Sequence, residues 1–425
     1  MFIHELDNWT NFNYDAQKLL DVVAEVNMAV GDFNGRLKSI GFDEQMTASV
    51  ETATSNIVAS SEVEGVVVNT DEVRSSVARK LGVPLQEETT PSHYVEGIVD
   101  MFLDAVVNYD KPLTEQRLFS WHQLLFPVRN LSVSDMHIGQ YRNSEMSVVS
   151  GTFGRERIHY RAPGPERVGP EMADFLKWLN DDSVRPSFIK SAIAHLWFVS
   201  IHPFADGNGR IARAISDMIF AQIEKSGKRF FSMSKQINKD KKHYYKVLER
   251  VQRGDGDITE WLMWYLNCIK EAVVDASEML NLVLRKTVFW RNHADVSVSD
   301  RQRNILNLYL DGYDAKITIK NWMKLAEVSK DTALRDITDL VNKGILLPAQ
   351  GRVRNVSYSI VYKEVSPVSC FENIQIENGV ISVVYEGKSH TDHLLSSDVD
   401  RLCAEEISKE DLAYKYFAYL LPEEK

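Results

Sequence analysis

Apolar residues recur every three or four positions through long stretches of this chain, and that spacing commits those stretches to amphipathic helices. Residues 15–40 are the clearest case, because their apolar positions follow the helical period and Gly41 supplies a stop. The sequence therefore predicts a mainly α fold. Further helices are predicted at 43–61 (ending near Gly65), 70–81, 92–109, 114–126, 170–180, 186–200, 207–226, 239–253 and 257–277, the last extending toward Trp290. Residues that mark helix starts are Asp43, Thr70, Ser92 and Thr114.

After residue 139 the pattern changes from the helical period to that of short strands. Two β-branched runs, 147–150 and 157–160, flank a segment that contains Gly151 and Gly154. This arrangement predicts a β-hairpin inserted among the helices.

A polar stretch at 295–300 predicts a domain boundary. Three short helices and two strands follow, at 300–311, 319–326, 330–343, 345–347 and 356–360. This order is typical of a winged helix-turn-helix. Farther on, the Asn378–Gly379 dipeptide between the apolar runs 374–376 and 380–384 predicts a hairpin, and a helix-like end follows it.

The composition excludes several classes of protein. With 44% apolar residues and no run of about 18 of them, the chain can bury real cores but is not expected to span a membrane. Its first residues lack the basic and apolar parts of a signal peptide. The three cysteines, Cys268, Cys370 and Cys403, are too scattered for a disulfide framework or a zinc site, which fits a reducing, cytoplasmic location. A net charge of −11 argues against extensive nucleic-acid coating, although a local basic face remains open.

One twelve-residue segment, HPFADGNGRIAR from His202 to Arg213, concentrates reactive side chains at a break between two predicted helices. Glycines on both sides of Asn208 let backbone N–H groups and the positive end of a helix face an anion, as phosphate-binding helix starts do. Asp206 offers an oxygen to Mg²⁺. Arg210 and Arg213, three positions apart, share a helix face from which both can reach phosphate. His202 is then placed to remove a proton beside an activated phosphorus.

The same residues also have a purely structural interpretation, in which His202–Pro203 ends one helix, Asp206 caps the next and the arginines are solvated. The segment, however, resembles the complete active-site motif of the Fic family, His-Pro-Phe-any-Asp/Glu-Gly-Asn-Gly/Lys-Arg-any-any-Arg. No specified position departs from that pattern. We therefore favour the functional interpretation.

The resemblance implies a role for each matching position. His202 would deprotonate a hydroxyl of a target protein, and Asp206 would hold Mg²⁺. The hydroxyl would attack the α-phosphorus of ATP, so that AMP is attached to the target and pyrophosphate leaves. The sequence contains no P-loop and no kinase signature set. The residues that would bind ATP through its phosphates are Gly207, Asn208, Gly209, Arg210 and Arg213.

Two further parts of the chain are similar to the family. The hairpin at 147–160 occupies the position of the family's flap, which aligns a target segment by adding it as a strand. Residues Tyr244, Tyr245 and Gln252 fall where the family has its adenine pocket, although core packing explains the tyrosines equally well. His195, on an apolar helix, is expected to be a core histidine with satisfied hydrogen bonds. The target-positioning residues of the flap would be Val148, Val149, Ile158, His159 and Tyr160.

Residues 60–65, Ser-Ser-Glu-Val-Glu-Gly, resemble the inhibitory motif of the family, Ser/Thr-any-any-any-Glu-Gly/Asn, at the end of a predicted helix. The resemblance implies that Ser60, Glu64 and Gly65 form a brake. Glu64 would pair with Arg213, occupy its phosphate-binding fork and repel the γ-phosphate of ATP. The alternative is a solvated Glu64 beside a helix-ending glycine.

The first eighty or so residues resemble the N-terminal region attached to a bacterial subgroup of Fic proteins, on the strength of Trp9, Asn11, Tyr14 and Asp15 and the helix that follows. The resemblance implies a protein adenylyltransferase that acts on a Ser, Thr or Tyr hydroxyl of an unidentified protein. The target can be the chain itself. A homodimer is also expected. The expected parts are an N-terminal helical region with the inhibitory helix (1–85), a Fic catalytic domain (86–292), a winged helix-turn-helix (297–362) and a hairpin-and-helix extension (363–425).

Other functions stay open. A DNA-binding regulator would use residues 330–343 as a recognition helix, with Arg352 and Arg354 at the tip of a wing. Three aspartates on that helix, Asp331, Asp336 and Asp339, and its mildly basic surroundings oppose DNA binding and favour protein docking or dimerisation. A Fic enzyme that removes AMP, or that uses another nucleotide or phosphocholine donor, is a further alternative.

Overall fold

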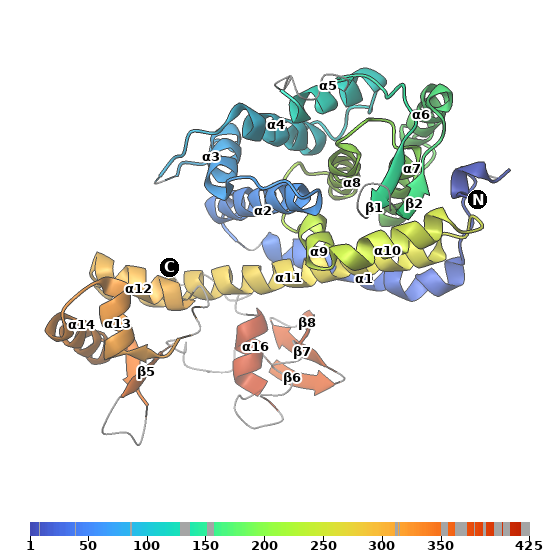
Figure 1. The fold of residues 1–425 in the computed structure, drawn as a ribbon. Helices are drawn as coiled ribbons and strands as arrows, with labels where there is room; N and C mark the ends of the chain where they lie inside the picture. Colours follow the sequence, from blue (N-terminus) through green and yellow to red (C-terminus); the bar gives the residue numbers. More distant parts are fainter. Residues whose placement is uncertain are drawn as a thin grey trace. The chain divides into compact units, whose positions relative to one another are not determined.

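The computed structural model describes all residues of the chain except 8, 39, 86, 128–136, 151–156, 311, 312, 314, 350–355, 362–371, 378, 386, 387, 395–401, 403–408 and 418–425. The described residues form two compact units, Met1–Leu280 and Asn281–Lys425 (Figure 1). Apolar side chains are buried inside each of them.

The first unit is built from helices and one hairpin, which confirms the mainly α fold predicted from the apolar spacing. The short helices η1 and α9 have no counterpart among the predicted ones. The helices are η1 (Ile3–Glu5), α1 (Ala16–Leu37), α2 (Phe42–Val63), α3 (Thr70–Leu81), α4 (His93–Val107), α5 (Glu115–Leu125), α6 (Pro165–Leu179), α7 (Phe188–Ile201), α8 (Asn208–Glu224), α9 (Met233–Lys239), α10 (Lys241–Gln252) and α11 (Thr259–Asn292), whose last residues belong to the second unit.

Several helix starts lie where a capping side chain is available. Ser92 and Thr114 accept hydrogen bonds from backbone N–H groups in the first turns of α4 and α5, as predicted. Asp15 does the same for α1. These caps satisfy N–H groups that the helix itself leaves unpaired.

Two predicted helix starts and one predicted capping residue are wrong. Helix α2 follows Gly41, so Asp43 lies inside its first turn rather than before it. The predicted bounds of α3, 70–81, are confirmed, but its cap is Asn69 rather than Thr70, and the Asn69 side chain accepts from the N–H groups of Asp71 and Glu72. Helix α6 begins at Pro165, well before the predicted start, since proline is tolerated in the first turn of a helix.

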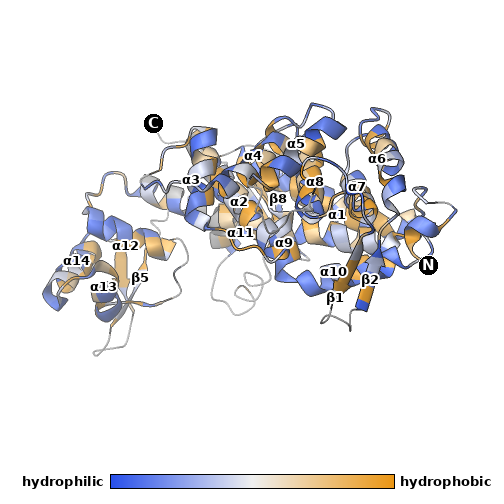
Figure 2. Ribbon diagram, turned by 45° about the horizontal axis from the view of Figure 1, so that its top comes forward, coloured by the Kyte–Doolittle hydropathy of each residue, from blue (hydrophilic) through white to orange (hydrophobic). Residues whose placement is uncertain are grey.

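Helices α7 and α8 form the centre of the first unit. They pack against each other, and α4 packs on α8. Nearly every residue of α7 is buried, so this helix is apolar all round, whereas the outer helices show hydrophilic outward faces (Figure 2). Even so, none of the helices in the described part of the chain combines the length and apolar content that crossing a bilayer requires.

Helix α2 and the hairpin lie next to these central helices. Helix α2 packs against α3 and α9 and also contacts α8. The hairpin strands β1 (Ser147–Ser150) and β2 (Arg157–Arg161) pair antiparallel, with a shift of register between Val148 and Val149. The strands are those predicted; the turn with Gly151 and Gly154 lies outside the described residues.

The second unit contains two small cores. One is formed by three helices and an antiparallel sheet of order β3-β5-β4, around Trp322 and Leu340. Its elements are α12 (Asp300–Leu310), β3 (Ile317–Thr318), α13 (Ile319–Ala326), α14 (Lys330–Asn342), β4 (Leu346–Pro348) and β5 (Ser357–Ile360). These helices and the strands β4 and β5 are the predicted ones, and β3 was not foreseen. The residues Arg352 and Arg354 lie outside the described ranges.

The other small core joins a three-stranded antiparallel sheet to a helix, around Val383 and Leu412. The hairpin predicted at Gly379 is present, and the additional strand β8 extends it. The elements are β6 (Glu372–Glu377), β7 (Val380–Tyr385), β8 (Lys388–His393) and α16 (Lys409–Phe417).

Candidate active site

The turn between α7 and α8 carries the candidate base. His202 ends α7 in a left-handed backbone conformation (φ 52°), which is uncommon for a residue with a side chain. Its ring Nδ1 lies 3.2 Å from the carbonyl oxygen of Val199. Because a carbonyl can only accept, Nδ1 carries the proton and Nε2 keeps its lone pair. Burial lowers the pKa of His202 below its ordinary value, so the ring is a neutral base at pH 7.

Arg142 holds this turn in place. Its side chain is buried and donates from Nε to the carbonyl of His202 (2.8 Å) and from Nη2 to that of Ile201 (3.3 Å). Its backbone N–H donates to the carbonyl of Pro203 (2.9 Å). A guanidinium at the end of α7 satisfies carbonyls that the helix leaves free and matches the negative end of its dipole. Arg142 therefore stabilises the unusual backbone of His202.

The first turn of α8 is built by Gly207 and Asn208. Gly207 precedes the helix with φ 84°, where a side chain would be strained. The amide of Asn208 accepts from the N–H of Phe204 (2.9 Å) and donates to its carbonyl (2.7 Å). The Asn208 side chain is thus committed to the turn. The backbone N–H groups at the start of α8 are what can face an anion.

Asp206 is the exposed carboxylate of the site, with 60% of its side chain accessible. Its Oδ1 accepts from the N–H of Gly207 (2.5 Å). His122, buried on α5, donates from Nε2 to the backbone carbonyl of Asp206 (3.2 Å), while its Nδ1 accepts from the N–H of Gly139 (2.9 Å). Burial lowers the pKa of His122 to about 4, so this ring stays neutral. His122 therefore fixes the backbone from which Asp206 projects.

Two arginines on one face of α8 provide the cationic part of the site. Arg210 and Arg213 are both 3% exposed. Arg210 donates from Nη1 to the hydroxyl of Tyr94 on α4 (2.9 Å), and its guanidinium lies over the ring of Phe126 at 5.3 Å. Arg210 Nε and Arg213 Nη1 are buried without a hydrogen-bond partner among the described residues. Both side chains therefore have donor capacity left for an anion.

Arg213 is also bound by the end of α2. It donates from Nε to the hydroxyl of Ser60 (2.8 Å) and from Nη2 to the Ser60 carbonyl and to Oε1 of Glu64 (2.8 Å each). Burial of Glu64 raises its pKa, but the charge and the hydrogen bond of Arg213 outweigh this effect, and the net pKa lies below its ordinary value. Glu64 is thus ionised. The predicted pairing of Glu64 with Arg213 is present.

The Glu64 carboxylate also lies against the first turn of α8. A Cβ atom added to Gly209 would lie 2.1 Å from Glu64 Oε1, so only a glycine there leaves room for it. Gly65 follows with φ 75°, and the N–H groups of Gly65 and Val66 donate to carbonyls of Glu62 and Ser61. These bonds form a Schellman motif, which ends α2 at Glu64 and aims its side chain at α8.

The predicted adenine-pocket residues differ in their surroundings. Tyr244 is buried, and its hydroxyl lies 3.0 Å from Nε2 of His195. Gln252 is buried too and donates to the hydroxyl of Ser200 (3.1 Å). Tyr245 is partly exposed and donates to the carbonyl of Val63 at the end of α2 (3.3 Å). Tyr245 is therefore the accessible member of this set nearest the site. His195 is a buried core histidine with both nitrogens bonded, as predicted.

Some of the predicted flap residues have exposed side chains, and one of them, Tyr160, is buried. Val149 and Ile158, which are paired across the hairpin, are exposed. Tyr160 is 1% exposed and points inward. His159 lies 2.8 Å from Glu249 of α10 through Nδ1, and Val148 pairs with Tyr160. The hairpin thus has an outward apolar surface and an inward anchor.

The sequence did not predict Arg142, His122 or Tyr94 as parts of the site. Arg142 lies in a loop, where no periodic signal marks it, and His122 and Tyr94 lie on helices whose apolar pattern explains them without a function. Each is far from the twelve-residue segment in the chain and reaches it only through packing.

The residues at this site suit a magnesium ion only in combination with a phosphate ligand. Among the described residues, no group of three or more His, Cys, Asp or Glu side chains lies together as a metal-binding cluster. Mg²⁺ retains waters and is commonly bound by one or two carboxylates together with substrate phosphates. The single exposed carboxylate of Asp206 beside an anion-binding helix start fits that requirement.

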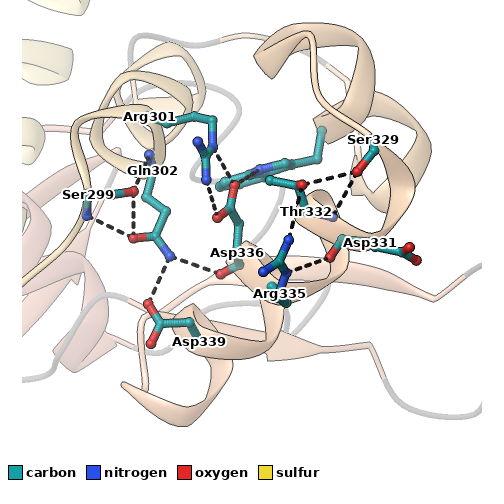
Figure 3. A network of polar contacts seen from close by, with 10 residues as sticks. Ser299, Arg301, Gln302, Ser329, Asp331, Thr332, Arg335, Asp336 and Asp339 are labelled. Atoms are coloured by element: carbon teal, nitrogen blue, oxygen red, sulfur yellow. Dashed lines mark hydrogen bonds and ion pairs between the residues drawn. The ribbon is translucent and has the colours of Figure 1, made fainter.

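Contacts within the second unit affect the alternative proposal that α14 binds DNA. Arg301 forks onto both oxygens of Asp336 (2.8 Å each), and Gln302 donates to Asp339 (2.9 Å), as Figure 3 shows. Asp336 is 7% exposed. Two of the three aspartates that opposed DNA binding are thus engaged by α12, but the Asp339 side chain remains 43% accessible and Asp331 is exposed. Only Asp336 is withdrawn from the surface, so most of the argument from these charges against DNA binding stands.

Fold and site together define a helical domain in which a helix start with two arginines, suited to binding phosphate, is occupied by a glutamate of its own chain. Residues 112–220 match the family described as Fic/DOC, and residues 2–83 match a domain of unknown function, DUF4172. The chain therefore carries a Fic/DOC domain, preceded by a DUF4172 region.

Named relatives match parts of the chain. The protein adenylyltransferase fic-1 of Caenorhabditis briggsae is 46% identical over 57 residues, which are 13% of this chain and 11% of that protein. The uridine 5'-monophosphate transferase of Xanthomonas campestris pv. campestris (strain 8004) is 34% identical over 114 residues, 25% of this chain and 20% of that protein. A Fic family protein of Desulfovibrio desulfuricans G20 has a solved structure that is similar with a TM-score of 0.48 and 20% identity, covering 81% of this chain and 96% of that one. The chain thus spans a fifth or less of the length of these two curated relatives.

Proposed function

We propose that the protein transfers AMP from Mg-ATP to a hydroxyl side chain of a protein and that Glu64 restrains this activity. One observation carries the proposal. The Glu64 carboxylate lies 2.8 Å from Arg213 and against Gly209, at the start of α8. A partly buried anion at that position indicates what the site is built to bind, because the helix start and the arginine together favour negative charge.

In the proposed reaction, Nε2 of His202 takes the proton of the target hydroxyl. The hydroxyl oxygen forms a bond to the α-phosphorus, the bond from that phosphorus to the bridging oxygen breaks, and pyrophosphate leaves with the electron pair. The first N–H groups of α8 and the guanidinium of Arg210 stabilise the charge on the phosphates. Asp206 would hold Mg²⁺, which neutralises charge on the phosphate oxygens when it is bound.

The proposed brake acts through competition for Arg213. As long as Nη2 of Arg213 donates to Glu64, it is not available to the outer phosphates. The ionised Glu64 also repels them. Removal of Glu64 frees a charge-assisted contact of about 1.5–3 kcal/mol, which corresponds to roughly a ten- to hundredfold gain in productive ATP binding.

The test is to incubate the full chain and its Glu64→Gly and His202→Ala variants with α-labelled ATP and Mg²⁺, and to measure label on protein by gel and mass spectrometry. We expect the strongest label with Glu64→Gly and none with His202→Ala. Equal labelling by both variants would show that these two residues do not act as proposed. Absence of label from every variant, even with lysate as the target, would favour another donor or the reverse reaction.

A different nucleotide donor is a second candidate, because one matched relative is named a uridine 5'-monophosphate transferase. The same residues would then hold UTP, since helix starts and arginines bind phosphates without regard to the base. Competition between α-labelled ATP and α-labelled UTP in the Glu64→Gly variant distinguishes the two donors. Preferential transfer of UMP would replace the adenylyl proposal with a uridylyl one.

A third candidate is a DNA-binding or dimerising role for the second unit, in a cytoplasmic protein. The outward face of α14 carries Lys330 and Arg335 next to Asp331. A gel shift that weakens steeply with salt would support DNA binding, since phosphate neutralisation makes the affinity salt-dependent. An absent or salt-insensitive shift would leave protein docking or homodimer formation as the proposed role, which light scattering can measure.

A further inference from the structure

The first residues of the chain contact strand β2 of the flap hairpin. Residues 2–7 and 9–13, here called the N-terminal strap, run past β2, α6 and α10 in the first unit (Figures 1 and 2). Ile3 and His4 in this strap are almost completely buried. The strap belongs to the region that matches a domain of unknown function.

A chain of hydrogen bonds links the strap to the end of α7. Nδ1 of His4 lies 3.1 Å from the hydroxyl of Tyr160, and this hydroxyl donates to the carbonyl of Ser200 (2.7 Å). The single proton of Tyr160 is used at Ser200, so His4 must donate from Nδ1. Burial lowers the pKa of His4 to about 4, which keeps this ring neutral. Ser200 stands two residues before His202 in the sequence, so the strap, the flap anchor and the active-site turn are connected.

Aromatic contacts join the strap to Tyr160, the inward side chain of β2. The ring of Phe2 meets that of Tyr160 edge-on at 5.3 Å, and the guanidinium of Arg253 lies over Phe2 at 5.0 Å. The same guanidinium donates to the backbone carbonyls of Ile158 and His159. Arg253 thus binds two backbone carbonyls of β2 and the strap at the same time.

The strap also makes hydrogen bonds to α6 and to Gly256. Trp9 donates from Nε1 to Glu171 of α6 (2.5 Å), and Arg167 of the same helix donates to the carbonyl of His4 (3.2 Å). The N–H of Asn13 donates to the carbonyl of Gly256 (3.1 Å). Such anchoring at both ends holds Phe2 and His4 in place against β2.

We propose that the N-terminal strap is a positioning element that holds the flap at a fixed position relative to His202. An extended segment of the protein substrate can then add to the edge of β1 that does not pair with β2. The inference rests on the proposed function. Arg253 occupies two backbone carbonyls of β2, and among the described residues β1 pairs with β2 alone, so the other edge of β1 is assigned to the substrate. The exposed Val149 lies on that strand.

Hydrogen exchange of the full chain tests the coupling without need of a substrate. We expect His4→Ala, made in the Glu64→Gly background, to speed exchange of the amides at 147–150 and 157–161 by about tenfold, because local opening of the flap becomes easier. Exchange in α8 should not change. The variant His4→Gln keeps an N–H donor and should stay near the parent, and His93→Ala, which alters an exposed histidine on α4, is the control.

The kinetic arm uses a second copy of this chain with His202→Ala as the protein substrate and α-labelled ATP as the donor. We expect His4→Ala to raise the KM for the copy several-fold and to leave the KM for Mg-ATP within twofold. Trp9→Phe, which removes only the bond to Glu171, serves as a milder variant if His4→Ala does not fold.

The outcomes separate the two proposals. Unchanged flap exchange in both strap variants overturns the coupling, whether or not AMP is transferred. Faster flap exchange with an unchanged KM for the copy overturns the positioning of substrate. Faster flap exchange in a chain that transfers no nucleotide in any form supports the coupling and removes the proposed function.

Discussion

Glu64 places a carboxylate where the first turn of α8 and Arg213 both favour an anion. The side chain remains partly accessible, at 25% exposed, so a competing ligand can approach it. The contact therefore holds Glu64 at the start of α8 and leaves it accessible to a competing ligand.

The protonation of His202 predicts how the rate depends on pH. Burial lowers the pKa of this ring below 6.5, and the nearby Glu64 charge raises it slightly, so removal of Glu64 lowers it further. The base form is therefore the major form at pH 6.5. For the Glu64→Gly variant, we expect the acid limb of the initial rate of AMP transfer to have its midpoint below pH 6.5. An acid limb with its midpoint above 6.5 would contradict the assignment of His202 as the base.

His122 offers a second test at the level of single residues. His122→Phe keeps a ring to stack on Phe204, which now lies at 4.3 Å, but loses both hydrogen bonds to the backbone of the site. Leaving these groups unpaired costs about 1–3 kcal/mol of unfolding free energy. We expect a higher Mg²⁺ concentration for half-maximal transfer, because the backbone of Asp206 is released. Urea denaturation and a Mg²⁺ titration in the Glu64→Gly background measure the two effects.

The matched variant is His122→Gln, whose amide can still donate toward Asp206. It should recover part of the Mg²⁺ response. If His122→Phe loses stability but keeps the Mg²⁺ response of the parent, His122 has only a structural role.

At the scale of elements, the end of α2 is what converts a local sequence into a brake. Its Schellman motif depends on Gly65, and the end of the helix is held by Arg213 from α8 and by Tyr245 from α10. Asn238 of α9 donates to Glu62 (2.7 Å) as well. The brake is thus set by the docking of α2 on three other helices, and any change that loosens this helix end should release activity.

Gly65→Ala tests this dependence. The added Cβ meets nothing within 4 Å, so the cost is that of a left-handed backbone with a side chain, about 1–2 kcal/mol. We expect AMP transfer at a rate between those of the parent and of Glu64→Gly, measured with α-labelled ATP.

Gly82→Ala provides the control, because Gly82 ends α3 with φ 71° and equally open space around it. It should lose similar stability in urea without any gain in transfer. Equal activation by both substitutions would mean that general loosening, rather than the position of Glu64, controls the activity.

At the scale of the whole chain, every candidate site residue lies within the first unit. That unit buries its own core, centred on α7 and α8, and the second unit has its own cores. The described residues assigned to the candidate site therefore all come from Met1–Leu280.

A fragment of residues 1–292, which includes all of α11, tests this independence. We expect it to unfold cooperatively and, with Glu64→Gly, to transfer AMP at a rate within about threefold of the full chain, since a compact unit with its own core folds alone. Circular dichroism and the labelling assay measure both properties. A folded fragment that is inactive would show that the second unit is needed for the reaction.

Local patterns predicted the helices of the first unit other than η1 and α9, the flap strands and the reactive side chains of the twelve-residue segment. The helical period and the caps at Ser92 and Thr114 depend on neighbours within a few residues, so they can be predicted from the sequence. The cap of α3 was missed because Asn69 and Thr70 are adjacent and both can cap a helix, and the start of α2 was missed because Gly41 before it has no side chain to cap the helix.

Contacts between distant segments were decided by packing. Glu64 meets Arg213 across 149 positions, and the resemblance to a known motif suggested that pair while the distance itself came from the docking of α2 on α8. Arg142, His122 and His4 gained their roles in the same way. The inward direction of Asp336 is another such case. A side chain's partner depends on which faces of separate elements are brought together, and the local period carries no information about that choice.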